Sequence, residues 1–277
     1  MTKFKVGVIG FGFVGESQAF AFAPVADVKI YDVDPTRKTH ELNEVMKQDF
    51  IFVCVPTPMK EDGTQDLSYI EGFFDSIDTK YTESNQIFII KSTILPGTTN
   101  YLIDKYRWNI VFCPEFLTEK TAKLDMLTQS RIVIGGSSHL TSLVKELFIS
   151  RFGQKHYILT DTISAETIKY MANNFLSVKV SFMNDYYDFV ESTGGNWEDV
   201  VEGFTSDPRI GNSHTQVPGH DGKRGFGGTC FPKDINATIN FAKKRDIKMP
   251  TLDAAWETNL RVRPEQDWKQ LKGRAVS

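Results

Sequence analysis

Short apolar runs alternate with longer stretches of helical spacing through the first half of the chain. The runs have the length of buried strands, and each is followed by a polar or glycine-containing turn. Alternating strands and helices are typical of a doubly wound α/β domain, in which helices cover both faces of a parallel sheet. The predicted strands are 4–9, 28–31, 50–55, 86–90, 109–113, 131–134 and 156–159, and the predicted helices between them are 16–23, 67–75, 97–105 and 140–152.

The pattern changes near residue 160. Residues 164–192 keep helical periodicity without Pro or Gly, and they carry an apolar stripe. A helix this long and apolar is typical of packing against other helices or a second subunit, so we expect a homodimer. Further helices are predicted at 196–204, 233–245 and 252–263, with a long loop at 205–229. The sequence therefore predicts an α/β domain at 1–160 and an all-helical domain at 161–277.

Composition narrows the class of protein. Hydrophobic residues make up 40% and charged residues 24% of the chain, as in ordinary globular proteins. The net charge of −3 gives no electrostatic basis for binding nucleic acid or an anionic membrane. Three cysteines lie far apart, which predicts neither a disulfide framework nor a metal site. Without an apolar run near membrane-spanning length or an N-terminal signal core, we expect a cytoplasmic protein.

A glycine-rich loop follows the first predicted strand and precedes a helix. This is the context in which G-x-G-x-x-G indicates dinucleotide binding, because glycines let the backbone approach a pyrophosphate at a helix N-terminus. Asp32 ends the second strand, where a carboxylate binds both ribose hydroxyls and repels a 2′-phosphate, which favours NAD over NADP. Arg37 lies close enough in sequence to contact the adenosine end. The loop residues assigned to the cofactor are Gly10, Gly12, Phe13, Val14 and Gly15.

Polar residues follow several of the predicted strands. Ligands of open α/β sheets bind beyond the carboxyl ends of the strands, so these side chains should line one crevice. Each of them is also compatible with turn or cap chemistry, Thr57 between two prolines most of all. The residues are Thr57, Thr93, Glu115 and Glu119.

Residues 225–234, GFGGTCFPKD, place a cysteine between a glycine loop and a helix start. Pro232 suits the first helical turn, and the helix N-terminus favours the Cys230 thiolate, as do Arg224 and Lys233 nearby. Asp234 follows four residues later, and a thiolate with a carboxylate and backbone N–H groups suits covalent chemistry on a carbonyl. The alternative is a structural cysteine in a turn.

Lys169 and Asn173 are spaced i, i+4 on the long predicted helix and therefore share a face. Apolar residues on the same face argue against a mobile, solvated lysine. From the spacing alone, a functional pair and an ordinary pair on the helix surface are equally good interpretations.

Taken in order, these motifs resemble the UDP-glucose dehydrogenase family of nucleotide-sugar 6-dehydrogenases along nearly the whole chain. The resemblance implies a Rossmann-type NAD domain followed by a helical central domain that dimerises. GFGGTCFPKD is its most specific element. The matching motifs are GFGFVG from Gly10, PTP from Pro56, KST from Lys91, CPEFLTEKTA from Cys113, KYMANN from Lys169, RIGN from Arg209 and GFGGTCFPKD from Gly225.

The resemblance implies two successive oxidations of the sugar 6-hydroxyl, from alcohol to aldehyde to carboxylate, with two NAD reduced. It implies that Lys169 and Asn173 stabilise negative charge on the sugar oxygen, the lysine as cationic donor or as base. Cys230 would attack the aldehyde to give a thiohemiacetal and then a thioester, which water hydrolyses. Asp234 and Glu115 would assist proton transfer and position water, with Thr93 nearby.

Further positions match the family only by resemblance. Glu119 and Lys233 correspond to residues near the cofactor, and Arg209 to an arginine that family dimers supply to the neighbouring active site. The implied substrate-binding residues are Glu115, Phe116, Leu117, Lys169, Asn173, Arg209, Phe226, Gly227 and Phe231.

The chain departs from the family in two places. It ends at Ser277, where the family continues into a second α/β domain that helps to bind the nucleotide, and the stretch between Arg209 and Cys230 is longer than usual. Three interpretations of the short chain are open: it is a minimal enzyme, an enzyme that works with a separate partner, or a fragment.

Several functions compete. UDP-glucose is the expected substrate, with GDP-mannose or UDP-N-acetylmannosamine as alternatives. A β-hydroxyacid dehydrogenase needs no nucleophilic thiol, so Cys230 argues against it. A catalytically idle binding or dimerisation core is the alternative outside enzymes, and the joint presence of the polar site residues argues against that.

Overall fold

A computed structural model describes residues 4–77 and 85–277 of the chain. It divides into two compact units, the first made of Met1–Thr57 and Leu67–Lys169 and the second of Pro58–Asp66 and Tyr170–Ser277. The domain division at residue 160 remains a prediction.

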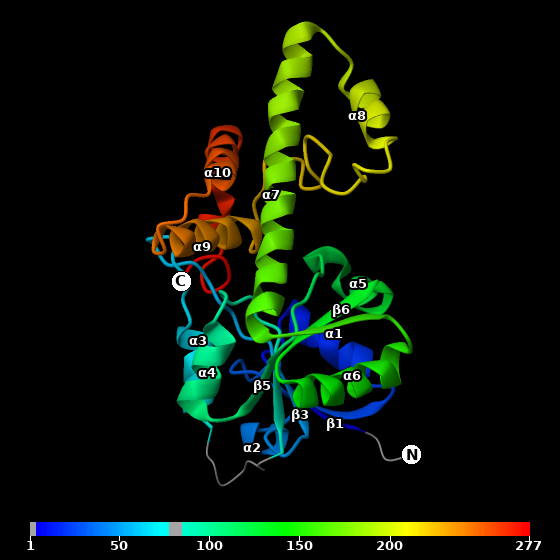
Figure 1. Ribbon diagram of the computed structural model, residues 1–277, viewed down its shortest axis with the longest axis vertical. Coiled ribbons are helices and arrows are strands. Elements are labelled where there is room, and N and C mark those ends of the chain that lie inside the picture. The colour runs from blue at the N-terminus through cyan, green and yellow to red at the C-terminus, as the bar shows by residue number, and fades with distance from the viewer. Residues whose placement is uncertain (1–3, 78–84) are drawn as a thin grey trace. The chain divides into compact units, whose positions relative to one another are not determined.

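Within the described residues, the first unit is built on a seven-stranded sheet in the order β2-β1-β3-β4-β5-β6-β7 (Figure 1). Each predicted strand is present, within about two residues at its ends. The strands are β1 Phe4–Ile9, β2 Ala26–Tyr31, β3 Phe50–Val53, β4 Ile87–Ile90, β5 Asn109–Phe112, β6 Arg131–Gly135 and β7 His156–Thr160.

The sheet is not parallel throughout. β5 and β6 pair antiparallel, with Phe112 opposite Gly135, while the other neighbours run parallel. Parallel neighbours need a connection that returns the chain to the same end of the sheet. Between β5 and β6 the chain instead packs α5, Ala122–Thr128, on α1 and enters the sheet from the opposite end. Neither α5 nor the 3₁₀ turn η2 (Glu119–Thr121) before it was predicted.

Helices cover both faces of the sheet (Figure 1). Successive side chains of a strand point to opposite faces, so Phe52 packs with α1 and α6 while Ile51 and Val53 pack on the side of α3 and α4. Both faces are therefore buried, which is why these strands are continuous apolar runs. The helices are α1 Phe13–Phe22, the short α2 Leu42–Val45, α3 Ser68–Asp75, α4 Thr98–Tyr106 and α6 Ser138–Phe152.

The second unit is helical. The long helix α7, Thr162–Thr193, supplies it from Tyr170 onward, and the predicted shorter helices follow as α8 Trp197–Thr205, α9 Phe231–Lys243 and α10 Pro250–Val262. The 3₁₀ turn η3, Asp267–Gln270, comes after them and was not predicted. α9 starts two residues earlier than predicted, so that Pro232 lies in its first turn. Residues 58–66 join this unit, where the Met59 N–H donates to the Ala275 carbonyl at 2.9 Å.

Among the described residues, no helix combines the length and the apolar character needed to cross a membrane.

Candidate active-site residues

The glycine loop lies between β1 and α1, and its three glycines face different constraints. Gly10 has a left-handed φ of +85°, and a Cβ there would come within 2.7 Å of the Cys54 carbonyl oxygen. A Cβ at Gly15 would run into the Gly10 carbonyl, so both positions exclude a side chain. No atom lies within 4 Å of a Cβ at Gly12. Gly12 therefore leaves open space at the helix N-terminus, which Phe13 and Val14 begin, as the approach of a ligand's phosphates would require.

Asp32 is fixed beside this loop. Its Oδ2 accepts the Phe11 N–H at 2.6 Å and its Oδ1 accepts the Asp34 N–H at 2.8 Å. The carboxylate is thus held at the end of β2, next to the glycine loop, as a ribose-binding acid requires. Arg37 is exposed, and its Nε lies 3.5 Å from an Asp34 oxygen. The loop and Asp32 together fit a dinucleotide.

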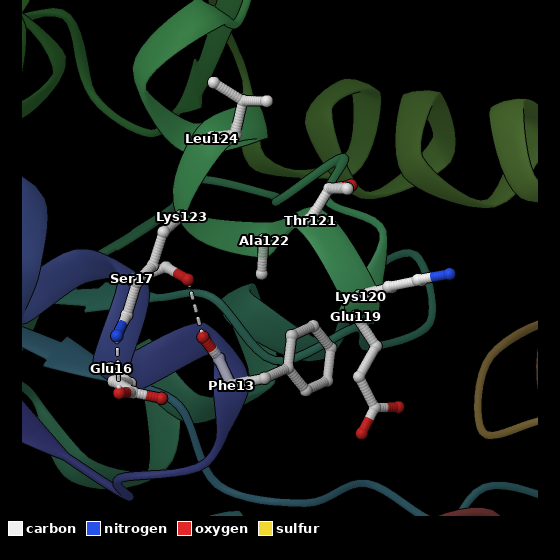
Figure 2. A pocket seen from close by; sticks show the side chains of 9 residues that line it. All are labelled: Phe13, Glu16, Ser17, Glu119, Lys120, Thr121, Ala122, Lys123 and Leu124. Atoms are coloured by element: carbon white, nitrogen blue, oxygen red, sulfur yellow. Dashed lines mark hydrogen bonds and ion pairs between the residues drawn. The ribbon is translucent and has the colours of Figure 1, made fainter.

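A pocket of about 430 Å³ opens between the start of α1 and the segment from η2 to α5 (Figure 2). Phe13 and Glu119, both predicted to bind the cofactor, line it together. An ion pair between Lys123 and Glu16, 2.7 Å long, joins its two sides. The remaining lining residues, which the sequence did not single out, are Ser17, Lys120, Thr121, Ala122 and Leu124.

Thr57 and Thr93 meet beyond the carboxyl ends of β3 and β4. The Thr57 hydroxyl donates to the Thr93 carbonyl at 2.7 Å, and both residues are buried. This bond ties two neighbouring strand ends together, as expected if they form one edge of a crevice.

Lys169 and Glu115 form a buried ion pair in the first unit. The Lys169 Nζ lies 3.0 Å from Glu115 Oε1 and donates to the Glu115 carbonyl at 2.5 Å, and both side chains are less than 7% exposed. Burial works against ionisation of Glu115, yet Lys169 and the Leu117 N–H, 2.6 Å away, hold its pKa below the ordinary value. The Lys169 ammonium also lies 5.3 Å from the centre of the Phe116 ring. The structure thus places Glu115 and Phe116 beside the Lys169 ammonium, with the Leu117 N–H bonded to the same carboxylate.

Cys230 lies at the N-cap of α9 in the second unit and is half-buried. Its carbonyl accepts the Asp234 N–H at 3.0 Å. Asp234 is only 1% exposed and accepts from Asn173 Nδ2 at 2.6 Å and Lys233 Nζ at 2.5 Å. Three predicted residues therefore form one hydrogen-bonded chain, a helical turn from the thiol.

Two aromatic residues flank the same loop, and one predicted residue stands apart. Phe226 and Phe231, which bracket residues 227–230 in the sequence, pack edge to face with their ring centres 6.1 Å apart. Arg209 does not join this group, since its side chain is 86% exposed and its guanidinium pairs with Asp207.

Comparison with known proteins identifies the family. The model of the NAD-binding domain of the UDP-glucose/GDP-mannose dehydrogenase family matches residues 36–150, and the model of its central domain matches residues 163–261. A UDP-glucose 6-dehydrogenase of Bacillus subtilis is 30% identical over 319 residues, which cover 99% of the chain and 68% of that protein. The chain belongs to the UDP-glucose/GDP-mannose dehydrogenase family. NAD is accordingly the cofactor of its first unit, and the predicted resemblance, fold class and cofactor are confirmed.

Two further family members define the extent of the match. A UDP-glucose 6-dehydrogenase of Rickettsia conorii is 35% identical over 225 residues, covering 78% of the chain and 50% of that protein. A UDP-glucose dehydrogenase structure from Pyrobaculum islandicum has a TM-score of 0.82 at 26% identity, covering 94% of the chain and 68% of that structure. The chain thus spans about half the length of the rickettsial relative.

Proposed function

We propose that the chain is an NAD-dependent nucleotide-sugar 6-dehydrogenase that oxidises UDP-glucose to UDP-glucuronate. The observation that carries the proposal is Cys230 at the N-terminus of α9, one helical turn from the buried carboxylate of Asp234. A single oxidation of an alcohol requires no thiol, whereas oxidation of an aldehyde to an acid gains from a covalent intermediate. UDP-glucose is the substrate in the names of the relatives from Rickettsia conorii and Bacillus subtilis.

In the proposed reaction, bound NAD supplies the hydride acceptor for each oxidation. Lys169 and Asn173 stabilise negative charge on the sugar oxygen as the alcohol becomes an aldehyde. The Cys230 Sγ then bonds to the aldehyde carbon as the C=O double bond opens and its oxygen takes a proton, which gives a thiohemiacetal. Loss of a hydride to the acceptor and of the hydroxyl proton leaves a thioester on Sγ. Water breaks the C–S bond, which releases the carboxylate and returns the thiol, while Asp234 and Glu115 orient the water and move its protons.

Gly12→Ala is expected to separate cofactor binding from folding. Gly12 has a φ of −75°, which any residue adopts, and no protein atom opposes a Cβ there. The melting temperature should therefore change little, while the added methyl group should weaken NAD binding by roughly tenfold or more, because the backbone no longer reaches the pyrophosphate. Calorimetric titration with NAD measures this. Gly15→Ala is the contrast, since its Cβ would meet the Gly10 carbonyl and should lower the melting temperature. Unchanged NAD affinity in Gly12→Ala would remove the cofactor role of this position.

The nucleotide and sugar are tested by comparing UDP-glucose, GDP-mannose and UDP-N-acetylmannosamine with NAD. We expect kcat/KM for UDP-glucose to exceed the other two by roughly tenfold or more, since the mismatched base of GDP-mannose or the mismatched sugar of UDP-N-acetylmannosamine leaves polar groups unpaired. A preference for another sugar nucleotide would contradict UDP-glucose as the substrate but agree with the proposed type of reaction. If none of the three is oxidised, the result would favour a catalytically idle binding or dimerisation core.

The homodimer is also part of the proposal. Five large apolar residues of α7 lie exposed at spacings that place them on one face, Phe175 at 66%. They are Met171, Phe175, Phe182, Tyr186 and Phe189. Phe175→Glu is expected to convert a dimer into monomers in light-scattering chromatography, because a buried unpaired charge opposes association. Tyr69→Glu, on an exposed face of α3, should leave the mass unchanged. A parent protein that is already monomeric would contradict the dimer.

The cytoplasmic location of the protein stays a prediction.

A further inference from the structure

The loop that leads to Cys230 packs on α10, and its glycines meet that helix closely. Gly225 has a φ of +66°, and a Cβ there would run into the Asn259 side-chain oxygen. A Cβ at Gly227 would come within 2.6 Å of Arg263 Cζ and 2.7 Å of its Nε. Gly228 has a φ of +71° and open space beside it. Close contact with two polar side chains therefore explains why the first two of these positions lack a side chain.

Asn259 holds the backbone of Phe226 in the way that a neighbouring strand would. Its Oδ1 accepts the Phe226 N–H at 2.7 Å, and its Nδ2 donates to the Phe226 carbonyl at 3.0 Å. Asn259 is fully buried. A buried amide with both of its ends committed to one residue fixes that residue's position, because breaking either bond leaves a buried polar group without a partner.

Arg263 lies one turn further along the chain, and its guanidinium is fixed from several sides. It is 2% exposed and donates to Asp221 Oδ2 at 2.6 Å, to Asp267 Oδ1 at 2.7 Å and to the Arg224 carbonyl at 3.3 Å. Burial works against ionisation of Asp221, yet Arg263 and the Lys223 N–H hold its pKa below the ordinary value. The guanidinium is thus a charged, planar surface that cannot turn away from Gly227.

Asp221 reaches Arg263 from a short turn within residues 218–223. The Gly219 N–H donates to the Lys223 carbonyl at 2.7 Å, and the Gly222 N–H donates to the Gly219 carbonyl at 2.9 Å. Gly222 has a φ of +75°, which closes the turn. The turn lies in the stretch between Arg209 and Cys230 that departs from the usual family spacing, so these residues supply one anchor of the arginine.

We propose that Asp221, Asn259, Arg263 and Asp267 form a cradle of positioning residues for the loop at 225–228, and that the cradle sets where the Cys230 thiol meets the aldehyde. Asn259 and Arg263 contact the loop, while Asp221 and Asp267 hold Arg263. Through the thiol the cradle acts on the second oxidation, because the first oxidation needs no thiol. The role of the cradle in the reaction rests on the proposed function. That the cradle holds the loop at 225–228 follows from the hydrogen bonds and close contacts alone.

Two variants test the cradle, with one control. Arg263→Lys keeps the charge and removes the planar group, and Asp221→Asn is milder because Asp267 still holds Arg263. Arg245→Lys, just beyond the end of α9, is the matched control, since Arg245 is exposed and its guanidinium donates to the nearby Phe241 carbonyl. Hydrogen exchange of the peptide that covers residues 224–230 follows the loop, and the ratio of aldehyde to uronate released from UDP-glucose follows the thiol.

In Arg263→Lys we expect the loop amides to exchange roughly tenfold faster or more, as the loss of charged hydrogen bonds implies. The released ratio of aldehyde to uronate should rise by a similar factor, because the first oxidation should slow less than the second. Asp221→Asn should move both readouts in the same direction by less, and Arg245→Lys should move neither.

The outcomes separate the cradle from the proposed function. Unchanged loop exchange in both variants would overturn the cradle. Faster exchange with an unchanged product ratio would overturn its positioning role, because a purely structural loss lowers both oxidations together. If the parent makes no product, the proposed function fails, and faster exchange in Arg263→Lys still establishes the cradle as the support of the loop.

Discussion

Cys230→Ser is expected to lose UDP-glucuronate formation by a factor of roughly 10³ or more while it still binds NAD. Near neutral pH a serine hydroxyl is a far weaker nucleophile than a thiolate. The first oxidation needs no thiol, so the aldehyde should form and be released. Mass spectrometry of the products from UDP-glucose and NAD measures both species.

Cys54→Ser is the matched control for that substitution. Burial raises the pKa of Cys54 to about 12, so its thiol is not expected to react near neutral pH. Uronate formation in this variant should stay within about twofold of the parent. Uronate made at the parent rate by Cys230→Ser would show that no covalent bond to this residue is required.

Lys169→Met is expected to destabilise the first unit by about 3–5 kcal/mol at neutral pH and to block the first oxidation. The substitution leaves the Glu115 carboxylate buried without its ion-pair partner, which costs more than the pair itself contributes. Urea unfolding measures the change in the free energy of unfolding. Lys123→Met breaks the exposed pair with Glu16, whose side chains are about half exposed, and should cost less than about 1 kcal/mol.

The contribution of the Lys169–Glu115 pair to folding stability should depend on pH. Because the pKa of Glu115 is lowered in the folded protein, the pair stabilises the fold above the ordinary carboxyl pKa of about 4.3, and this contribution is lost as the pH falls through the lowered value. In Lys169→Met the carboxyl is instead favoured in its neutral form, so the stability gap to the parent should narrow on acidification.

A second substitution separates burial of the charge from loss of packing. Lys169→Met combined with Glu115→Gln removes the unpaired charge and should recover at least half of the lost stability. No recovery in the double variant would mean that the lysine acts through packing and not through the charge of Glu115.

The predicted strands agree with the structure because both faces of the sheet are buried, which leaves a strong apolar signal in runs such as 50–53 and 87–90. α5 carries a weaker signal, since it is seven residues long and its buried residues are Ala122 and Met126 alone. The antiparallel pairing of β6 depends on where α5 packs on α1, and no pattern within β6 records that contact.

In the site, too, contacts between residues far apart in sequence could not be predicted. Spacing placed Lys169 and Asn173 on one face of a helix but left an ordinary surface pair open. Their partners, Glu115 and Asp234, lie 54 and 61 residues away in sequence, so only the folded chain reveals that both polar groups are buried and paired. Asn259 and Arg263 were not predicted as site residues, because polar residues near a helix end are typical of a solvated surface. Their i, i+4 spacing was the one available signal that they share a face of the helix.

The number of NADH molecules formed per molecule of UDP-glucuronate tests the central claim most directly. Purified protein with NAD and limiting UDP-glucose is followed by NADH absorbance and by mass spectrometry of the sugar nucleotide. Two NADH per UDP-glucuronate is the predicted result, since two hydrides leave one carbon and Cys230 carries the intermediate between alcohol and acid. One NADH with an aldehyde as the final product, or no NADH with any of the three sugar nucleotides, would contradict the four-electron oxidation.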